Sequence, residues 1–270
     1  MRYSRWLTGI ITCLYATYTY AWGQMGHRVI AEIASNHLEP QAAQHIAKLT
    51  GGRSLAELST WLDEVRADKA YKSYATWHFI VWPVDGHLDT MTHPKQGDLI
   101  TGYAVAEEIL QHSTDPKKRQ EALAILVHLV GDAHQPLHVN NGADKGANQC
   151  IVGWFSKQRK MRLHKIWDSV MLNSMGLSYT ELAHFLDHSS DAEIVTLQTA
   201  PIQEWLRESY ALHAAVYPVS TTWHSYCQPD NQERIPVLSY RYIYEHKPII
   251  EKRLLQAGMR LAGVLNRLFK

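Results

Sequence analysis

The chain has 270 residues, of which 46% are hydrophobic, and its 27 basic and 26 acidic side chains give a net charge of +1. This length allows one large domain or two small ones. The near-neutral charge excludes the broad basic surface of a protein that holds duplex nucleic acid through phosphate contacts. Sixteen histidines against four phenylalanines are an excess that would suit a protein with several metal ions.

Residues 1–21 have the pattern of a secretory signal peptide. Arg2 and Arg5 form a basic start, a mostly apolar run follows from residue 7 to residue 20, and Ala21 ends a small-x-small cleavage site. An uncleaved anchor is the alternative, but the run is short and rich in Thr and Tyr for a membrane span. We therefore expect a signal peptide at 1–21 and one mature domain at 22–270, exported to the periplasm or secreted.

The first residues of the mature chain are candidate metal ligands. Cleavage after Ala21 would make Trp22 the first residue, with a free α-amine whose pKa near ~8 lets it bind metal as a neutral nitrogen. Gly23 and Gly26 allow a tight fold-back, so this amine and His27 could reach one ion. Taken alone, His27 is better explained as a residue at the start of a helix than as a ligand.

Hydrophobic periodicity predicts an all-α, mainly helical single domain with a small β-hairpin or short strands. A buried helical stripe begins at Val29 and ends at Leu38. Further helices are expected at 40–49, 55–66, 102–111, from 116 to the region of 132, and at 179–187, 199–215 and 235–268. In the 102–111 helix, Ala104, Val105 and Ile109 are expected to face inward. Residues 150–155 are expected to form a strand or hairpin arm.

Several polar residues between these helices admit two interpretations. Asp63 and Arg66 share one helix face, where an exposed ion pair is the simpler explanation. His78 stands in the apolar run 77–83. The basic run 157–162 is either a solvated loop or an edge that contacts phosphate. Cys150 and Cys227 could form a disulfide in an oxidising compartment.

The strongest motif is a repeated His-x-x-x-Asp. His128 and Asp132 leave one helix face a turn apart, and His138 follows just after the helix ends at a proline. His164 and Asp168 repeat the spacing. A single such pair is often a surface ion pair or a capped core histidine. Two pairs with an additional histidine match the imidazole and carboxylate ligands of zinc.

The order of these motifs resembles the S1/P1 nuclease family. Trp-Gly-x-x-Gly-His, Asp-x-x-Arg, Trp-His-Phe, His-x-x-x-Asp-x-x-Gln-Pro-Leu-His and Leu-His-x-x-Trp-Asp follow one another from Trp22 to Asp168. Beyond Asp168 the likeness is only one of length and helical character. The resemblance implies a helical fold shared with zinc phospholipase C and a cluster of three zinc ions.

The nine matching positions would share the three Zn²⁺ ions. Asp63, His78, His128 and Asp132 would hold the first; Trp22, through its amine and carbonyl oxygen, would hold the second with His27 and the bridging Asp132; His138, His164 and Asp168 would hold the third. His134 matches none of these positions, and we interpret it as a residue that supports the ligands or ends the helix.

The activity that this resemblance implies is zinc-dependent hydrolysis of single-stranded DNA and RNA to 5′-phosphate products, with 3′-nucleotidase activity. Asp63 and Asp132 would act through the metals, and Arg66 would offset charge on the transferring phosphoryl group. Phe79 would stack on a base, and Asn148 would contact substrate or support the cluster. We expect a monomer without stable membrane association.

The sequence departs from the family pattern at three places. Val81 stands where fungal members carry an acidic residue that bonds the base edge. Arg162 stands where many members have Asn. The loop 145–148 reads Lys-Gly-Ala-Asn, where Gly-Gly-Asn is usual. These departures concern substrate contacts and leave the metal positions filled.

Two other functions compete with the nuclease. A zinc-dependent phospholipase C would share the fold and an N-terminal Trp ligand, although the Gln-Pro-Leu-His and Asp-x-x-Arg features favour the nuclease. A zinc-binding or scavenging protein of the periplasm would hold exchangeable metal without turnover. Assays with single-stranded DNA and phosphatidylcholine would separate the first two.

Overall fold

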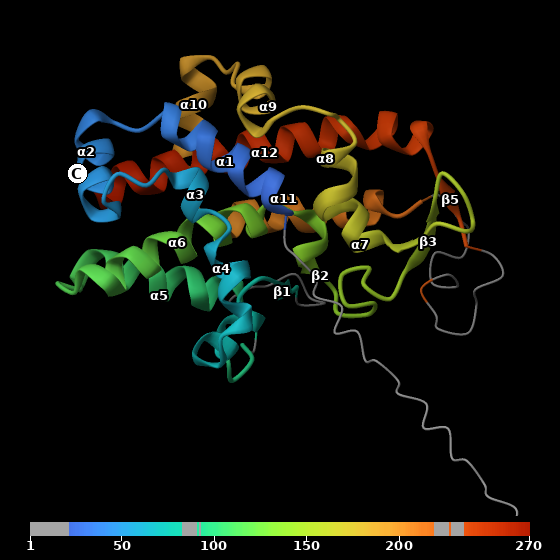
Figure 1. Ribbon diagram of the computed structural model, residues 1–270, viewed down its shortest axis with the longest axis horizontal. Helices are drawn as coiled ribbons and strands as arrows, with labels where there is room; N and C mark the ends of the chain where they lie inside the picture. Colours follow the sequence, from blue (N-terminus) through green and yellow to red (C-terminus); the bar gives the residue numbers. More distant parts are fainter. Residues whose placement is uncertain (1–21, 83–90, 92, 219–226, 228–234) are drawn as a thin grey trace, which may run out of the picture.

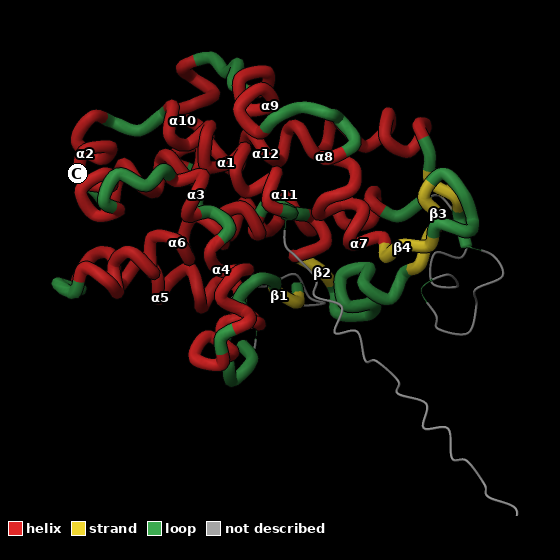
Figure 2. The backbone as a smooth tube through the Cα atoms, in the orientation of Figure 1, coloured by secondary structure: helices red, strands yellow, loops and turns green. Residues whose placement is uncertain are grey.

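Helices make up most of the chain in the computed structural model, which describes residues 22–82, 91, 93–218, 227 and 235–270 (Figure 2). The expected signal peptide at 1–21 lies outside the described residues. The α-helices are α1 (Gln24–Asn36), α2 (Pro40–Thr50), α3 (Leu55–Leu58), α4 (Trp61–Glu64), α5 (Leu99–His112), α6 (Pro116–Ala133), α7 (Leu163–Lys165), α8 (Met171–Asn173), α9 (Tyr179–Leu186), α10 (Asp191–Thr199), α11 (Ile202–Val216) and α12 (Tyr240–Leu268). The expected all-α, single-domain fold is confirmed.

Short helical turns connect several of these helices. The 3₁₀ helices Val65–Ala67 and Lys69–Thr76 follow α4, and Pro136–His138 follows α6. A π-helical turn, Ile166–Val170, joins α7 to α8. Turns of this kind are frequent at functional sites because they re-aim side chains within a helix.

The central helix α6 is defined by local signals at both ends. Asp115 caps its N-terminus by accepting from the backbone N–H groups of Lys117 and Lys118, and Pro116 occupies the first helical position. At the other end the chain leaves the helix before Pro136. Every residue from Ala122 to Ala133 is buried, because α1, α5, α11 and α12 all pack against this helix. Polar side chains in its last turns are therefore enclosed by the core.

The long C-terminal helix α12 spans much of the molecule, and α1 and α10 lie along it (Figure 1). Its buried face carries Ile250, Leu254, Leu261 and Leu265 at helical spacing. Helix α5 packs against α6 on the side away from α12. This packing leaves the C-terminal end of α6 facing the short strands, where the irregular segments meet.

Two small sheets stand at that end. Strand β1 (Ile80–Val81) pairs in parallel with β2 (Val139–Asn140), with Ile80 opposite Val139. In the second sheet β3 (Ile151–Trp154) lies between β4 (Lys160–Arg162), which is antiparallel, and β5 (Val237–Leu238), which is parallel. The expected hairpin arm at 150–155 is confirmed, and Cys150 is disulfide-bonded to Cys227.

Two expected helices are interrupted or shortened. The predicted helix 55–66 divides at Ser59 and Thr60, where Asp63 N–H bonds the Thr60 carbonyl and the Ser59 carbonyl accepts from the His128 ring. The predicted helix 235–268 begins only at Tyr240, because Val237 and Leu238 pair with β3. In both cases a contact distant in sequence takes the backbone out of the helix.

The expected inward face of the 102–111 helix was wrong for Ala104 and Val105, whereas Ile109 is partly buried and packs against the core. Ala104 and Val105 are exposed, whereas Tyr103, Ala106 and Leu110 are buried. The cause lies at Gly102, where an added Cβ would meet the Trp77 ring and Leu129 at 2.8 Å. The absent side chain lets α5 turn this face toward α6. No described helix is long and apolar enough to cross a membrane.

Candidate metal centre

The last two turns of α6 supply the centre of the site. His128 and Asp132 project from one face, with His128 Nε2 3.4 Å from Asp132 Oδ2, and both are fully buried. His128 Nδ1 donates to the Ser59 carbonyl at 2.7 Å. Because that carbonyl can only accept, Nδ1 carries the proton, and the lone pair of Nε2 faces Asp132 and His78 Nδ1, the latter at 3.1 Å.

A first group forms where α4 and the segment before β1 meet α6. Asp63, His78 and His128 each place a ligand atom within 4.8 Å of the others. Asp132 joins them, since His78 Nδ1 lies 3.0 Å from its Oδ2. Arg66, one turn after Asp63, pairs with Asp63 Oδ1 at 3.1 Å. The interruption of the predicted 55–66 helix is what brings Asp63 into this group.

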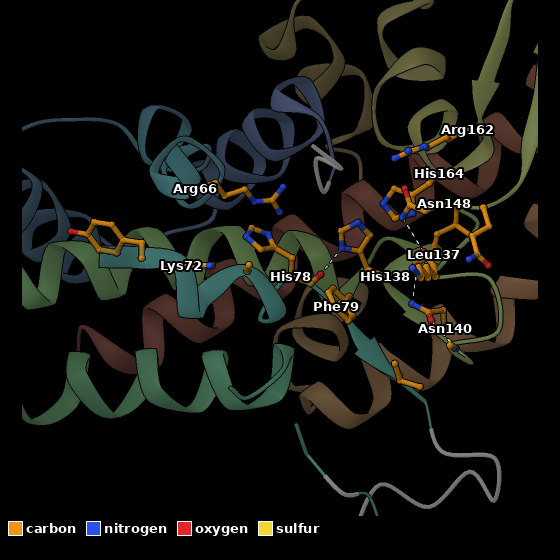
Figure 3. Close-up of a pocket in the computed structure, with 16 residues that line it drawn as sticks. Arg66, Lys72, His78, Phe79, Leu137, His138, Asn140, Asn148, Arg162 and His164 are labelled. Carbon is orange, nitrogen blue, oxygen red and sulfur yellow. Dashed lines mark hydrogen bonds between the residues drawn. The ribbon is translucent and has the colours of Figure 1, made fainter. Parts of the chain in front are cut away.

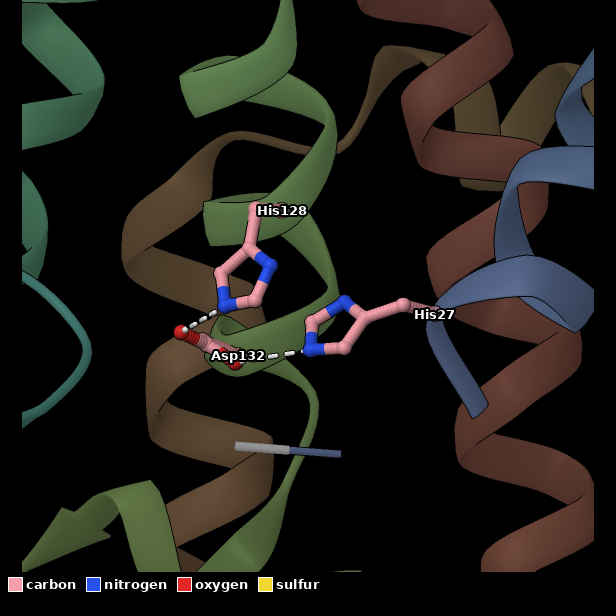
Figure 4. Close-up of side chains that lie close together, drawn as sticks. All are labelled: His27, His128 and Asp132. Carbon is pink, nitrogen blue, oxygen red and sulfur yellow. Dashed lines mark ion pairs between the residues drawn. The ribbon is translucent and has the colours of Figure 1, made fainter. Parts of the chain in front are cut away.

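A second group shares two of these residues and adds α1. His27 stacks on His128 with ring centroids 3.8 Å apart, and His27 Nε2 lies 3.5 Å from Asp132 Oδ1 (Figure 4). The two oxygens of Asp132 therefore face different histidines. Gly131 makes this approach possible, because a Cβ there would lie 2.7 Å from His27 Nδ1.

Trp22 lies five residues before His27, just ahead of α1, and is fully buried. The chain folds back tightly here, since a Cβ on Gly26 would meet the Trp22 Cβ at 2.9 Å. The N–H of Gly23 donates to the Asp168 carbonyl at 2.6 Å. This bond holds the first described residues against the segment that carries the third group.

The third group consists of His138, His164 and Asp168, with ligand atoms within 4.8 Å of one another. His138 Nδ1 donates to the His78 carbonyl at 2.5 Å and His164 Nδ1 to the Gly146 carbonyl at 2.6 Å. Both Nε2 atoms then face Asp168, at 3.7 and 3.1 Å. Backbone carbonyls thus fix the tautomer and ring direction of each ligand.

Gln135 supports this third group from behind. Its Nε2 donates to Asp168 Oδ1 at 2.5 Å, and its Oε1 accepts from Leu137 N–H at 2.5 Å. The side chain is fully buried. One amide therefore links the direction of Asp168 to the turn that presents His138.

Burial sets the protonation of the first two groups. Burial lowers the pKa of His27 and His78 well below the usual range, and that of His128 to about 3. It raises the pKa of Asp63 to about 7, although Arg66 opposes this rise, and raises that of Asp132 well above its usual value. Burial therefore favours neutral imidazoles and uncharged carboxyls, while a divalent cation would stabilise the carboxylate form.

The third group behaves differently. Burial alone would lower the pKa of His164, but the adjacent Asp168 carboxylate outweighs it and raises that pKa. Burial likewise opposes ionisation of Asp168, yet His164 and His138 lower its pKa overall. His164 and Asp168 therefore favour each other's charged forms, whereas burial opposes the charged forms of the ligands in the first two groups.

The donor set fits metal ions. Five ligand atoms in these groups are buried without a hydrogen-bond partner among the described residues: His27 Nδ1 and Nε2, His78 Nε2, Asp132 Oδ1 and His138 Nε2. Leaving so many buried polar atoms unpaired is costly for a folded protein. Convergent imidazole and carboxylate atoms of this kind are ligands that suit zinc.

The first and third groups border a cleft of about 840 Å³. His78, His138 and His164 line its floor, with Arg66 and Arg162 on either side (Figure 3). Phe79, next to His78, keeps 39% of its surface exposed at the cleft wall. Phe79 is therefore placed where a flat ring of a ligand could stack.

Asn148 and Val81 also line this cleft. Asn148 Nδ2 donates to the Lys145 carbonyl at 2.9 Å, and its buried Oδ1 has no hydrogen-bond partner among the described residues. Val81 is 46% exposed and offers no hydrogen bond to a ligand. Of the basic run 157–162, only Arg162 lines the cleft.

The structure brings together the eight side chains that the sequence singled out as metal ligands. Trp22 lies just ahead of α1, the helix that carries His27. His134 stays outside the three groups: its Nδ1 bonds the Val130 carbonyl at 2.7 Å and its Nε2 faces Arg260, as expected of a residue that ends a helix.

Two kinds of supporting contact were missed in the sequence. The carbonyls of Ser59 and Gly146, which orient ligand histidines, carry no side-chain signal. The support from Gln135 could have been suggested by its place in the Gln-Pro-Leu-His motif.

Known proteins are similar to this chain over most of its length. The S1/P1 Nuclease family model matches residues 22–270. Endonuclease 4 of Arabidopsis thaliana is 29% identical over 278 residues, which cover 92% of this chain and 89% of the relative. Nuclease S1 of Aspergillus oryzae is 27% identical, with 94% of each chain covered. Nuclease P1 of Penicillium citrinum is 30% identical over 56% of this chain and 58% of its own. The chain belongs to the S1/P1 nuclease family.

Proposed function

We propose that this protein is an exported zinc-dependent phosphodiesterase that hydrolyses single-stranded DNA and RNA to 5′-phosphate products and also acts as a 3′-nucleotidase. The observation that carries the proposal is the convergence of three buried His/Asp groups, of which the first and third reach the floor of one open cleft through His78, His138 and His164. Membership of the family, whose relatives include Nuclease S1, supports nucleic acid as the substrate.

Nine residues would hold three zinc ions. The first ion would take Asp63, His78, His128 and Asp132; the second Trp22, His27 and the other oxygen of Asp132; the third His138, His164 and Asp168. Trp22 would contribute its α-amine and carbonyl oxygen once the segment 1–21 is removed. When bound, zinc supplies a Lewis acid for phosphoryl oxygens and lowers the pKa of water.

The chain's own residues would position the substrate. Arg66 lies at the cleft beside the first group, where it pairs with Asp63, so its guanidinium would offset charge on phosphoryl oxygens as it develops. Phe79 would stack on a base without regard to its identity, because every base has a π-face. Val81 offers no polar group to a base edge, so we expect weak base preference at this position.

Single strands fit this cleft better than a duplex. A base can stack on Phe79 beside His78 only if it is not paired and stacked within a double helix. The overall charge of +1 supplies little general attraction for a duplex backbone. Selectivity for single strands over duplexes would therefore come from whether a nucleotide can enter the cleft and reach the buried His/Asp groups.

The test is a substrate panel run with metal analysis on the processed protein. We expect about three zinc ions per chain by elemental analysis, with hydrolysis of single-stranded DNA, RNA and a 3′-nucleotide. The same DNA annealed to its complement should be cut at least about tenfold more slowly. Turnover of phosphatidylcholine in place of single-stranded DNA would assign the protein to the phospholipases. Full zinc content without turnover of either would identify a metal-binding protein.

A further inference from the structure

Arg162 has a position in the cleft that the metal groups do not explain. It ends β4, where it pairs with Ile151, and it directly precedes the short helix that carries His164. Its side chain does not cap that helix. Figure 3 shows the guanidinium directed toward the cleft from above His164. The local backbone therefore needs no arginine here.

The guanidinium of Arg162 also differs from other arginines near the centre of the protein. Arg66 pairs with Asp63, and Arg253 and Arg260 both pair with Glu208. Within the described part of the chain, no acceptor bonds the Arg162 side chain. A half-buried guanidinium with unused donors on a cleft wall is available for an anionic ligand.

The rest of the cleft has the same sign of charge. Lys72 and Lys145 line it with Arg66 and Arg162, and none of the described lining residues is acidic. This concentration is local, because the whole chain carries a net charge of only +1. A groove lined by one sign of charge concentrates ligands of the opposite sign. The cations extend beyond the metal groups on both sides, so the cleft suits more than one phosphate.

We propose that Arg162 binds a phosphate that neighbours the one being cleaved, so that the enzyme prefers oligonucleotides to 3′-mononucleotides. This inference rests on the proposed function. Arg66 and Arg162 approach the cleft from opposite sides, with His78 and His138 between them (Figure 3). Arg66 therefore serves the phosphate at the metal groups and Arg162 the next one. Arg162 is a specificity residue in this account and takes no part in bond cleavage.

The test compares two substrates in Arg162→Ala. A single-stranded tetranucleotide presents neighbouring phosphates, whereas a 3′-mononucleotide has only one. We expect KM for the tetranucleotide to rise about tenfold, the loss typical of a hydrogen bond to a charged group, with kcat nearly unchanged. KM for the 3′-mononucleotide should stay the same. Arg162→Lys should recover part of the loss, because an ammonium keeps the charge without the planar fork.

Salt dependence distinguishes a phosphate contact from a base contact. Loss of one phosphate contact should reduce the slope of log(kcat/KM) against log salt by about 0.7 for a single strand. Arg159→Ala is the matched control, since Arg159 lies on the same hairpin, is exposed and does not line the cleft. Arg66→Ala is the contrast, because it should lower kcat on both substrates.

Three results would overturn the inference. They are an unchanged ratio of the two KM values in Arg162→Ala, equal losses in Arg162→Ala and Arg159→Ala, or an unchanged salt slope. Zinc content measured in each variant excludes indirect damage to His164. Failure of the proposed function is a separate result, because the wild-type protein would then hydrolyse neither substrate.

Discussion

Asp132 is the residue on which the first two groups depend. One oxygen lies 3.0 Å from His78 Nδ1 and the other 3.5 Å from His27 Nε2. The carboxylate is fully buried, and burial raises its pKa well above the usual value. A buried carboxylate with this geometry is stable as an anion only when positive charge faces it on both sides.

Asp132→Asn should therefore cost two metal ions. An amide has no negative charge and only one oxygen, so it cannot bridge two cations. We expect elemental analysis to show about one zinc ion per chain and the hydrolysis rate to fall at least about a hundredfold. Asp98→Asn is the control: Asp98 is equally buried but bonds Thr101 and His93 away from the metal centre. Full metal content in Asp132→Asn would contradict the bridge.

Trp22 gives a second test at this scale. Its side chain is buried and the next N–H bonds the Asp168 carbonyl, so the start of the described chain has little freedom. One extra residue ahead of Trp22 would convert the α-amine to an amide that cannot ligate metal as an amine does. We expect the extended protein to lose the second zinc and most activity, and proteolytic removal of the residue to restore both. Normal turnover with the extension intact would exclude amine ligation.

At the scale of helices, the metal centre depends on close contact between α1 and α6. Gly131 lies at the crossing, and His27 occupies the space that a Cβ would fill. Gly131→Ala should push the His27 ring away from Asp132 and cost about 1–3 kcal/mol in unfolding free energy. We expect lower zinc content together with the lower stability.

Gly258→Ala is the control for that substitution. A Cβ on Gly258 would lie 2.5 Å from Ile33 Cγ2, so it creates a comparable clash between α12 and α1 away from the metal groups. Its stability should fall by a similar amount while its zinc content stays complete. Equal zinc loss in both variants would show that general loosening of α1 is the cause, and would remove the specific role of Gly131.

The sequence could predict those elements whose signals are local. Asp115 and Pro116 set the start of α6, and two helical His-x-x-x-Asp spacings placed four ligands correctly relative to one another. Helix α10 was missed although Ser190 and Glu193 form a capping box, because its hydrophobic face is weak. Contacts between distant segments could not be predicted from local patterns. The Ser59 carbonyl bonds the His128 ring across 69 residues, and this contact divides the expected helix 55–66. The assignment of the candidate ligands to three groups came from the family resemblance, because spacing along the chain does not show which distant residues meet.

For the whole molecule, the metal centre gathers residues from Trp22 to Asp168, and the C-terminal helices hold this assembly from the other side. Arg253 on α12 donates from Nε to the His134 carbonyl at 3.2 Å, immediately before the Gln135 that supports Asp168. Arg253 and Arg260 both bond Glu208 of α11, at 2.5 and 2.6 Å. Both guanidinium groups are almost fully buried. Helices α11 and α12 therefore support the segment that carries the third group.

The charge state of this cluster determines how it contributes to stability. Burial lowers the pKa of Arg253 to about 10, so it stays protonated at neutral pH. Burial alone would raise the pKa of Glu208, but its bonds to Arg260 and Arg253 lower that pKa overall. A carboxyl whose pKa is lower in the folded state stabilises the protein above its unfolded pKa. That contribution is lost as pH falls through the folded pKa.

Glu208→Gln should therefore destabilise the protein at neutral pH and have little effect in acid. Removing the carboxylate leaves two buried guanidinium groups without a counterion. We expect a loss of about 2 kcal/mol at neutral pH, less than for a fully enclosed pair, because the Glu208 side chain is 31% exposed. Urea unfolding of both proteins after chelation, at neutral pH and again at a pH below the lowered folded-state pKa of Glu208, separates this effect from metal loss. Glu107→Gln is the control, since its partner Arg267 is 54% exposed and such a pair contributes at most about 1 kcal/mol. A difference between wild type and Glu208→Gln that persists unchanged in acid would show that shape, and not charge, holds α11 to α12.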